Sequence, residues 1–354
     1  MTRELHNVNI ESQTALLSPR LLKSEFSIKA STANSIVKFR DVISRIINHQ
    51  DERLLIIAGP CSIHNVEAAI DYSKRLKELS DRHRDTLLIV MRVYFEKPRT
   101  TLGWPGLIID PNLDGTYNIQ KGLRAARQLL IELSEIGLPA GTEVLDPIIP
   151  QYIADLVSWA AIGARTTESQ THRELSSGLS MPVGFKNGTD GNLSIAANAV
   201  RSARHGHSFI GINQEGETCV FKTLGNRNGH IILRGGSSGP NYYDEDVEEA
   251  ENLLADIGVK PSILVDCSHA NSSKNHARQA RVFRAVLDLL SRGRRSIRGV
   301  MLESNIKPGR QEIPEDASKL EYGLSITDSC IGWDETVELI DEAANELSKI
   351  KDAR

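Results

Sequence analysis

The chain has 354 residues, of which 40% are hydrophobic and 25% charged, and its formal net charge is -4. This mix is typical of a soluble globular protein and provides no electrostatic footprint for nucleic acid. The chain contains no apolar run long enough to predict a signal peptide or a membrane span. Four scattered cysteines without a CxxC pair favour a reducing compartment over a disulfide framework, so we expect a cytoplasmic protein.

Residues 1 to about 50 are expected to form an arm and a helix that precede the regular part of the chain. Ser31 or Thr32 is expected to cap this helix. Its apolar stripe, at helical spacing, consists of Ile36, Phe39, Ile43 and Ile46, widened by Val37, Val42 and Ile47. The stripe requires a partner, which is either the rest of the domain or another subunit. Residues 1–15 lack a clear pattern and are expected to order only against another surface.

Between residues 51 and 354, short apolar segments alternate with helical ones. The apolar segments are rich in Val, Ile and Leu and mostly continuous, as parallel strands buried on both faces are. The predicted strands are Leu54–Ala58, Leu87–Phe95, Ala140–Leu145, Ala161–Arg165, Val183–Lys186, Ile231–Arg234, Ile263–Cys267 and Gly299–Glu303. The predicted helices are 66–80, 118–136, 149–158, 168–179, 192–204, 244–257, 276–291 and 334–349.

Eight strands alternating with eight helices predict an α/β fold of the (β/α)8 TIM-barrel type. A doubly wound open sheet has a similar alternation, but it usually has fewer strands and a glycine-rich turn that is not found here. One segment, at about 208–223, is predicted to form an extra β-hairpin with its turn at Asn213–Gly216. A barrel does not need this hairpin, so we expect the hairpin and residues 1–50 to serve regulation or assembly.

Four potential metal ligands lie at or just beyond the ends of short apolar segments, namely Cys61, His269, Glu303 and Asp328. Because the carboxyl ends of barrel strands open at one mouth, we expect these side chains to gather there. A thiolate, an imidazole and two carboxylates suit a divalent first-row metal such as Mn, Fe, Co, Cu or Zn. Taken singly, each residue also fits a structural role, as a buried cysteine, a hydrogen-bonded histidine or a capping carboxylate.

Four cationic side chains end predicted strands, namely Arg92, Arg165, Lys186 and Arg234. Arginine and lysine suit phosphate and carboxylate groups, and too few carboxylates occupy comparable positions to neutralise all four. This deficit indicates a doubly anionic ligand, and the alternative is ion pairing with Glu143, Asp266 and Glu303.

Two loops next to these strands also favour anion binding. Lys97, Arg99 and Thr100 cluster just past the second predicted strand and indicate a second phosphate site, although a charged surface loop has the same composition. The glycine-bearing turn at 186–191 leads into a predicted helix, whose N-terminal N–H groups favour an anion.

Several long motifs match one enzyme family. They are GPCSIH at 59–64, RVYFEKPRT at 92–100, GARTTESQ at 163–170, GFKNGTDG at 184–191, LRGG at 233–236, DCSHAN at 266–271 and SITD at 325–328. With these motifs, over nearly its whole length, the chain resembles 3-deoxy-D-arabino-heptulosonate 7-phosphate (DAHP) synthase. The resemblance is to the microbial type I form, which has a feedback-regulated N-terminal extension.

The resemblance implies condensation of phosphoenolpyruvate with D-erythrose 4-phosphate and water to DAHP and phosphate, the entry step to aromatic amino acids. It implies one divalent metal ion on the four ligands named above. The implied phosphoenolpyruvate contacts are Arg92, Lys97, Ala164, Arg165, Lys186 and Arg234. The implied erythrose 4-phosphate contacts are Lys97, Arg99 and Thr100. The candidates for catalysis are Lys186 and, for placing water and moving protons, Lys97, Glu143 and His172.

Two positions depart from the family pattern. Pro105 stands where a lysine is expected after Gly-Trp, and Arg310 stands where asparagine is common. Neither belongs to the implied ligand set, so the departures concern loop details and not the reaction.

In this family an aromatic amino acid binds beside the barrel, against the hairpin and a neighbouring subunit's N-terminal arm. The matching positions are Pro147, Gln151, Ser180, Phe209, Gly211 and Val220, with Phe221 next to the last of them. Gly211 resembles the tyrosine-sensitive isoenzymes, and its missing side chain is expected to leave room for a phenolic hydroxyl. We therefore expect tyrosine inhibition in a homodimer or homotetramer, unless Gly211 is only a turn residue.

Three other functions are compatible with parts of the pattern. A sister synthase that uses arabinose 5-phosphate would share the mechanism, but the motif Lys97-Pro-Arg-Thr100 and the regulatory segments argue against it. A Schiff-base aldolase would use Lys186, which lies at the end of a predicted strand, as such lysines do in barrels. A non-catalytic amino-acid sensor on a barrel scaffold would be expected to have lost ligands, and none is missing.

Overall fold

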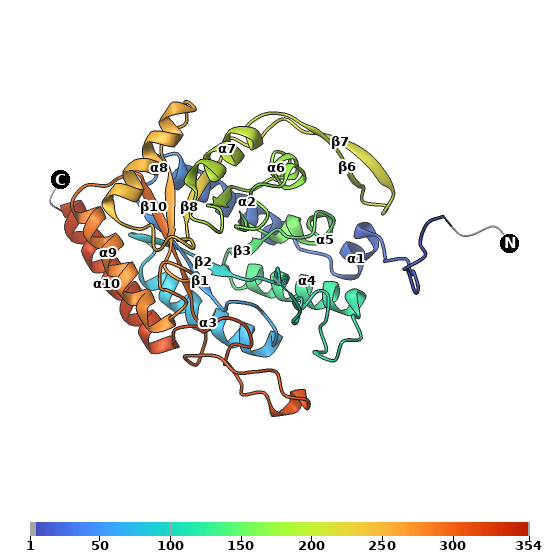
Figure 1. The fold of residues 1–354 in the computed structure, drawn as a ribbon. Coiled ribbons are helices and arrows are strands. Elements are labelled where there is room, and N and C mark those ends of the chain that lie inside the picture. Colours follow the sequence, from blue (N-terminus) through green and yellow to red (C-terminus); the bar gives the residue numbers. More distant parts are fainter. Residues whose placement is uncertain (1–4, 100, 353–354) are drawn as a thin grey trace.

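The computed structural model describes residues 5–99 and 101–352, which form a closed parallel barrel surrounded by helices (Figure 1). Around the barrel the strand order is β1-β10-β9-β8-β5-β4-β3-β2, and β1 closes it by pairing with β10 and β2. The barrel strands are β1 (Leu54–Gly59), β2 (Leu87–Arg92), β3 (Ala140–Glu143), β4 (Trp159–Ile162), β5 (Val183–Lys186), β8 (Gly229–Leu233), β9 (Ile263–Asp266) and β10 (Ile297–Glu303). The predicted TIM barrel is confirmed.

Helices follow the barrel strands and pack their apolar faces on the outer surface of the barrel. They are α3 (Val66–Arg82), α4 (Ile119–Glu135), α5 (Pro150–Ile153), α6 (Gln170–Ser176), α7 (Leu193–Ala203), α8 (Asp244–Asp256), α9 (Gln279–Ser291) and α10 (Trp333–Asp352). Short 3-10 turns are η1 (Ala154–Leu156), η2 (His276–Arg278) and η3 (Ala317–Lys319).

Several predicted segments differ from the observed ones at their ends; the second strand, for example, ends at Arg92 and not at Phe95. The segment at 149–158 is the single turn α5 followed by η1, and the segment at 168–179 is limited to α6. The fourth strand begins at Trp159 and ends at Ile162, because Gly163 starts a turn in which its carbonyl accepts the N–H groups of Thr166 and Thr167. Arg165 therefore lies three residues beyond its strand.

The side chains of the barrel strands alternate between two apolar clusters. Leu55 and Ile57 of β1 belong to an interior cluster with Val90, Trp159, Leu264 and Met301, whereas the neighbouring Leu54 and Ile56 pack in the outer cluster with the helices. This alternation follows from the two-residue period of a strand. The barrel is thus a packed core with its polar groups left to the ends of the strands.

Helix α2 (Ala30–Ile47) closes the amino-terminal end of the barrel. Its residues Ile43, Ile46 and Ile47 belong to the interior cluster, and Arg298 at the start of β10 donates from Nε to the Ile46 carbonyl over 2.9 Å. Of the two predicted partners for the apolar stripe, the barrel itself is the observed one. These side chains therefore share the barrel's core. The domain boundary predicted near residue 50 stays a prediction.

The start of the chain differs from the prediction in three respects. Helix α2 begins at Ala30 after Lys29, which makes no side-chain capping bond, so the predicted cap at Ser31 or Thr32 is wrong. Val37 is 62% exposed and does not widen the buried stripe. A further helix, α1 (Pro19–Glu25), was not predicted; Ser18 caps it by accepting the Leu21 N–H, and proline occupies its first turn.

The predicted hairpin is confirmed as β6 (Ser208–Ile212) paired with β7 (Thr218–Lys222). Figure 1 shows it projecting past the ring of helices on the side of α1, and the Arg20 N–H donates to the Gln214 carbonyl. Phe209 pairs with Phe221 on one face, and Ile210 pairs with Val220 on the other. Ile210 and Val220 are 76% and 72% exposed, so one face of the hairpin is apolar and open.

Within residues 5–99 and 101–352, no helix is long and apolar enough to cross a membrane. A cytoplasmic location stays a prediction.

We predict that Ile46→Ala lowers the free energy of unfolding by about 2–5 kcal/mol, because the buried side chain leaves a cavity between α2 and the barrel interior. Val37→Ala on the same helix is the matched control and is expected to change it by less than about 0.5 kcal/mol. Urea unfolding followed by circular dichroism measures both values. Equal stabilities for the two variants would mean that α2 does not support the barrel.

Candidate functional site

The carboxyl ends of the barrel strands surround a cavity of about 470 Å³. Among the described residues that line it, arginine and lysine side chains outnumber the carboxylates of Glu143 and Asp328. The cationic lining residues are Arg92, Lys97, Arg99, Arg165, Lys186, Arg234 and Lys274. The predicted cationic residues are thus brought together. Thr100, the uncharged member of the predicted second phosphate site, lies outside the described residues.

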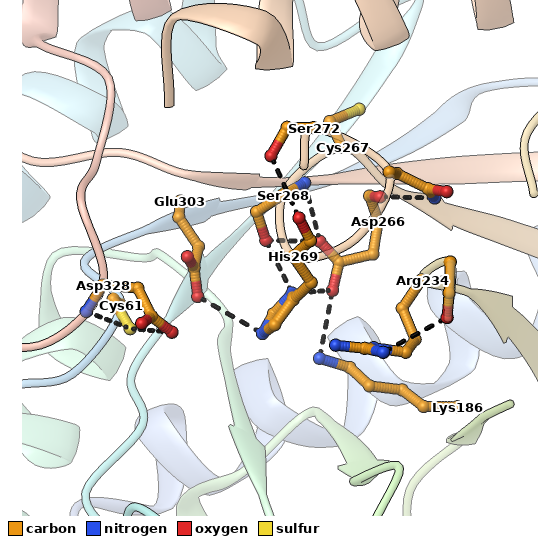
Figure 2. A network of polar contacts seen from close by, with 12 residues as sticks. Cys61, Lys186, Arg234, Asp266, Cys267, Ser268, His269, Ser272, Glu303 and Asp328 are labelled. Atoms are coloured by element: carbon orange, nitrogen blue, oxygen red, sulfur yellow. Dashed lines mark hydrogen bonds and ion pairs between the residues drawn. The ribbon is translucent and has the colours of Figure 1, made fainter. Parts of the chain in front are cut away.

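Cys61, Glu303 and Asp328 form a close group next to this cavity. One potential ligand atom of each lies within 4.8 Å of the others. The barrel register explains this, because Gly59 of β1 pairs with Glu303 at the end of β10. Asp328 is held beside the thiol, since its N–H lies 3.4 Å and its Oδ2 lies 3.6 Å from the Cys61 Sγ (Figure 2). These three residues are a candidate metal site.

His269, the fourth predicted ligand, is not part of the close group but faces it. Its Nε2 lies 3.8 Å from Glu303 Oε1, and its Nδ1 points the other way, toward Asp266 and Ser268 (Figure 2). The backbone of His269 has φ of 55°, in the left-handed region that is costly for a residue with a side chain. The fold thus holds His269 in an uncommon conformation that turns Nε2 toward the carboxylate of Glu303.

The donor set fits a divalent transition metal. Burial raises the pKa of the Cys61 thiol to about 11, and the nearby Glu303 carboxylate adds to the shift. Although burial opposes it, Lys97 and His269 hold the pKa of Asp328 below its usual value. Lys97 donates from Nζ to Cys61 Sγ over 3.1 Å. A metal cation would replace the thiol proton, since the thiolate is the form that binds metals.

Arg92 connects the candidate metal site to the cavity. Its side chain is 1% exposed, and it donates from Nη2 to Glu303 Oε1 over 2.9 Å and to the Cys61 carbonyl over 3.1 Å. The guanidinium also lies 3.5 Å from the ring centroid of Tyr94. The Nη1 atom is buried without a hydrogen-bond partner among the described residues. Because buried donors are normally paired, this atom indicates a missing acceptor.

Lys186 and Arg234 face the cavity from the ends of β5 and β8. Lys186 Nζ lies 3.0 Å from Asp266 Oδ2, and both side chains are buried. Burial lowers the pKa of Arg234 despite the Asp266 carboxylate, and the Arg165 guanidinium adds repulsion. The predicted alternative of internal ion pairing is therefore correct for Arg92 with Glu303 and for Lys186 with Asp266. The clustered cations around Arg234 still indicate an anionic ligand.

Of the remaining predicted substrate and catalytic residues, all but His172 and Thr100 line the cavity. Ala164, Arg165, Lys97 and Arg99 line the cavity, and so does Glu143. Glu143 packs directly on Gly163, where an added Cβ would come within 2.6 Å of its Oε1. A larger residue at 163 would therefore displace the Glu143 carboxylate from its present position.

His172 is the predicted catalytic residue that the structure does not bring to the cavity. It lies on α6, where Nε2 is 2.7 Å from the Leu145 carbonyl and Nδ1 is 2.9 Å from the Ser169 hydroxyl. A carbonyl only accepts, so Nε2 carries the proton and Nδ1 accepts from Ser169. Both ring nitrogens are thus hydrogen-bonded inside the protein, and nothing in these contacts supports a role in moving protons, so that role stays a prediction.

Two residues of the site were not predicted as functional. Lys274 lines the cavity, and Asp266 contacts both His269 and Lys186. Asp266 was considered only as an ion-pair partner, although its place three residues before His269 at the end of β9 was a usable signal. Lys274 has no such signal, because it reaches the cavity through a loop whose residues Ser273 and Lys274 have positive φ.

A second cavity, of about 700 Å³, lies between α2, α5, α6 and the hairpin. Of the predicted effector residues, Gln151, Ser180 and Phe209 line it. Val220 does not, because it points to the opposite, exposed face of β7, and its neighbour Phe221 lines the cavity instead. Pro147 is exposed and outside the lining, where Pro150 is found. Val220 and Pro147, predicted as effector-binding positions, thus lie outside this cavity, and their roles stay predictions.

Gly211 does not leave the expected open space. A Cβ at this position would lie 3.0 Å from two ring carbons of Phe221, so the Phe221 ring already occupies the volume beside it. The glycine allows the rings of Phe209 and Phe221 to lie 5.6 Å apart across the hairpin. Room for a phenolic hydroxyl is thus not explained by Gly211 alone.

Comparisons with known proteins show which family this chain matches in sequence and fold. The model of the DAHP synthetase I family matches residues 25–341. The "Phospho-2-dehydro-3-deoxyheptonate aldolase, Tyr-sensitive" of Salmonella typhimurium is 52% identical over 344 residues, which are 97% of this chain and 96% of that protein. The phenylalanine-inhibited aldolase of the same name from Saccharomyces cerevisiae is 46% identical over 345 residues, 96% of this chain and 93% of that protein.

A solved structure of the phospho-2-dehydro-3-deoxyheptonate aldolase from Francisella tularensis matches the fold with a TM-score of 0.94. It is 45% identical in sequence, and the match covers 96% of this chain and 99% of that one. The barrel, the N-terminal helices and the hairpin are therefore a shared architecture.

We predict that a divalent metal binds more tightly as pH rises from 7 to 9, by up to about tenfold per pH unit, because the Cys61 thiol must lose its proton. The apparent affinity follows the thiolate fraction, which increases up to a pH of about 11. Isothermal titration of metal-free protein with Zn²⁺ measures the slope. In Cys61→Ala the slope is expected to vanish, and a pH-independent affinity in the unaltered protein would exclude Cys61 as a ligand.

Proposed function

The chain belongs to the DAHP synthetase I family, and we propose from this premise that the cationic cavity and the adjoining donor group are its active site. The protein is a DAHP synthase, an enzyme of the first step of aromatic amino acid biosynthesis. The observation that carries the site assignment is the cavity of about 470 Å³ whose cationic lining adjoins Cys61, Glu303 and Asp328. Such a cavity suits two phosphorylated anions beside a metal ion.

The proposed substrates are phosphoenolpyruvate and D-erythrose 4-phosphate. We propose that Arg92, Arg165, Lys186 and Arg234 hold the phosphate and carboxylate of phosphoenolpyruvate, with the backbone of Ala164 beside them. The unpartnered Nη1 of Arg92 supports this assignment because it lacks an acceptor. Lys97 and Arg99, with Thr100, are proposed to hold the phosphate of the tetrose. Holding two anions together offsets their mutual repulsion and orients the reacting carbons.

One divalent metal ion, from the set Mn, Fe, Co, Cu or Zn, is proposed to bind Cys61, His269, Glu303 and Asp328. When bound, it supplies Lewis-acid polarisation of the aldehyde oxygen. The donor chemistry fits, since a thiol and two carboxylates lie close together beside the cavity and an imidazole nitrogen lies 3.8 Å from one of these carboxylates. The physiological metal is not determined by this donor set, because it suits several first-row ions.

In the proposed reaction, the methylene carbon of phosphoenolpyruvate attacks the aldehyde carbon of erythrose 4-phosphate. Cationic character develops at the carbon that bears the phosphate, water adds there, and phosphate leaves with cleavage of its C–O bond. Glu143 is proposed to position the water, because its carboxylate lines the cavity and only accepts hydrogen bonds when ionised. Lys97 is proposed as a proton donor. Burial lowers the pKa of Lys97, but the nearby Cys61 and Glu303 raise it by more, so the pKa lies above its usual value.

The alternative functions lose support. The family assignment and the presence of each expected ligand leave no observation in favour of a non-catalytic sensor. A Schiff-base aldolase requires a neutral amine, whereas Lys186 Nζ lies 3.0 Å from the carboxylate of Asp266. Arabinose 5-phosphate in place of erythrose 4-phosphate is tested directly in the assay below.

The second cavity is proposed to bind tyrosine as a feedback inhibitor. Its lining combines the aromatic rings of Phe209 and Phe221 with the polar groups of Gln151 and Ser180. The exposed pair Ile210 and Val220 on the hairpin supports a proposed homodimer or homotetramer, because paired apolar side chains on an open face favour contact with another protein surface.

We predict that the enzyme releases phosphate from phosphoenolpyruvate only when erythrose 4-phosphate and a divalent metal are both present. A chelator is expected to abolish release, and added Mn²⁺ is expected to restore it. A continuous phosphate assay with erythrose 4-phosphate or arabinose 5-phosphate measures the rates. Release with arabinose 5-phosphate alone would contradict the proposed substrate, and silence with each metal would contradict the proposed activity.

We predict that Arg165→Ala raises the KM for phosphoenolpyruvate by about 10- to 100-fold, because a charge-assisted contact to the substrate is lost. The KM for erythrose 4-phosphate is expected to change much less. Steady-state kinetics with each substrate varied in turn separates the two effects. Equal increases in both values would assign Arg165 to general electrostatics and not to one substrate.

We predict that Phe221→Ala raises the tyrosine concentration needed for half inhibition by about tenfold or more, because an aromatic wall of the cavity is removed. Val220→Ala, the adjacent residue on the opposite face of β7, is the matched control and is expected to leave inhibition unchanged. Inhibition curves with tyrosine, phenylalanine and tryptophan give the comparison. Stronger inhibition by phenylalanine than by tyrosine would refute the proposed effector.

A further inference from the structure

Asp266 occupies the point where the metal half and the substrate half of the site meet. It ends β9, is 1% exposed, and directs its carboxylate between His269 and Lys186 (Figure 2). Its Oδ2 lies 2.9 Å from His269 Nδ1 and 3.0 Å from Lys186 Nζ. Its Oδ1 accepts from the Ser268 N–H over 3.0 Å and from the Ser268 hydroxyl over 2.6 Å. Oδ1 is thus hydrogen-bonded by Ser268, whereas Oδ2 is held by ion-pair contacts with His269 and Lys186 and has no aligned hydrogen bond among the described residues.

These contacts determine which nitrogen of His269 carries the proton. A bare nitrogen lone pair 2.9 Å from a carboxylate oxygen would be repelled by it, so His269 Nδ1 carries the proton. Ser268 is consistent with this, because its hydroxyl proton is directed to Asp266 and its oxygen, 2.7 Å from His269 Nδ1, is left to accept. In the neutral ring Nε2 then bears the free electron pair, and this is the atom that faces Glu303.

The orientation of the imidazole depends on the same contacts. His269 has φ of 55°, an uncommon backbone conformation that brings its ring between Glu303 and Asp266. Asp266 is in turn held by Lys186 on one oxygen and Ser268 on the other. A carboxylate fixed in this way limits the rotation of the imidazole ring of His269. Carboxylate contacts of this kind commonly set the tautomer and direction of metal-binding histidines.

We propose that Asp266 is a positioning residue that fixes the tautomer and direction of His269, with Lys186 and Ser268 holding its carboxylate in place. The inference rests on the proposed function in one respect, since it takes His269 as a metal ligand. Asp266 touches neither metal nor substrate in this assignment and acts through its neighbours.

The test is the Zn²⁺ affinity of metal-free protein, measured at one pH by competition with a chromophoric chelator. In Asp266→Asn an amide replaces the carboxylate, so one pair of donors, either from Ser268 or from His269 and Lys186, meets an NH2 group. We expect the affinity to fall by about 10- to 100-fold. Ser268→Ala keeps the Oδ2 contacts of Asp266 and is expected to lose less.

Asp51→Asn is the matched control. Asp51 also forms an ion pair, with Arg53, but it lies at the opposite end of the barrel, so its variant is expected to bind Zn²⁺ like the unaltered protein. Equal Zn²⁺ affinities for the unaltered protein and Asp266→Asn would overturn the inference. Failure of the unaltered protein to bind Zn²⁺ would instead overturn the proposed metal site, so the two failures are distinguishable.

A second measurement needs no variant and covers the case in which Asp266→Asn does not fold. Long-range ¹H–¹⁵N spectra of protein with labelled histidines report which ring nitrogen is protonated, and His269→Gln assigns the signal. We expect the Nδ1–H tautomer for His269 in the metal-free protein and in the Zn²⁺-loaded protein. The Nε2–H tautomer in either state would overturn the inference.

Discussion

Closure of the barrel by parallel strands is the constraint on which the rest of the structure depends. The pairing of β1 with β10 places Gly59 beside Glu303, and the donor group of Cys61 and Glu303 follows from that register. Because the strands run in one direction, their polar carboxyl ends meet at one mouth while α2 fills the other with apolar side chains. The polar residues of the proposed active site and the apolar residues of α2 therefore lie at opposite ends of the barrel core.

The mouth of the barrel concentrates positive charge that the protein only partly neutralises. Arg92 and Lys186 each have an internal carboxylate partner, whereas the pKa of Arg234 is lowered by burial and the nearby Arg165 adds repulsion. An arrangement of this kind is held by the surrounding fold and becomes more favourable when anions bind. The electrostatic cost of holding these cations close together therefore contributes to the affinity for phosphorylated substrates, because bound anions relieve it.

The sequence was sufficient for the barrel and for most of the site, because continuous apolar strands and the residues at their ends follow simple rules. It was insufficient where a side chain's direction depends on tertiary packing. His172 has the right residue type near the mouth, but two internal hydrogen bonds turn it away. On β7, adjacent residues point to opposite faces, so of the two neighbouring positions named from the sequence, Val220 and Phe221, only Phe221 lines the cavity.

The order of the ligands along the chain has a consequence for biosynthesis of the protein. Cys61 follows the first barrel strand, whereas Glu303 ends the last one and Asp328 lies beyond it. During translation the thiol emerges from the ribosome well over two hundred residues before its carboxylate neighbours. Such long-range contacts form late and slowly in folding. The nascent chain therefore has no complete donor group until its final strand and the loop that carries Asp328 are released.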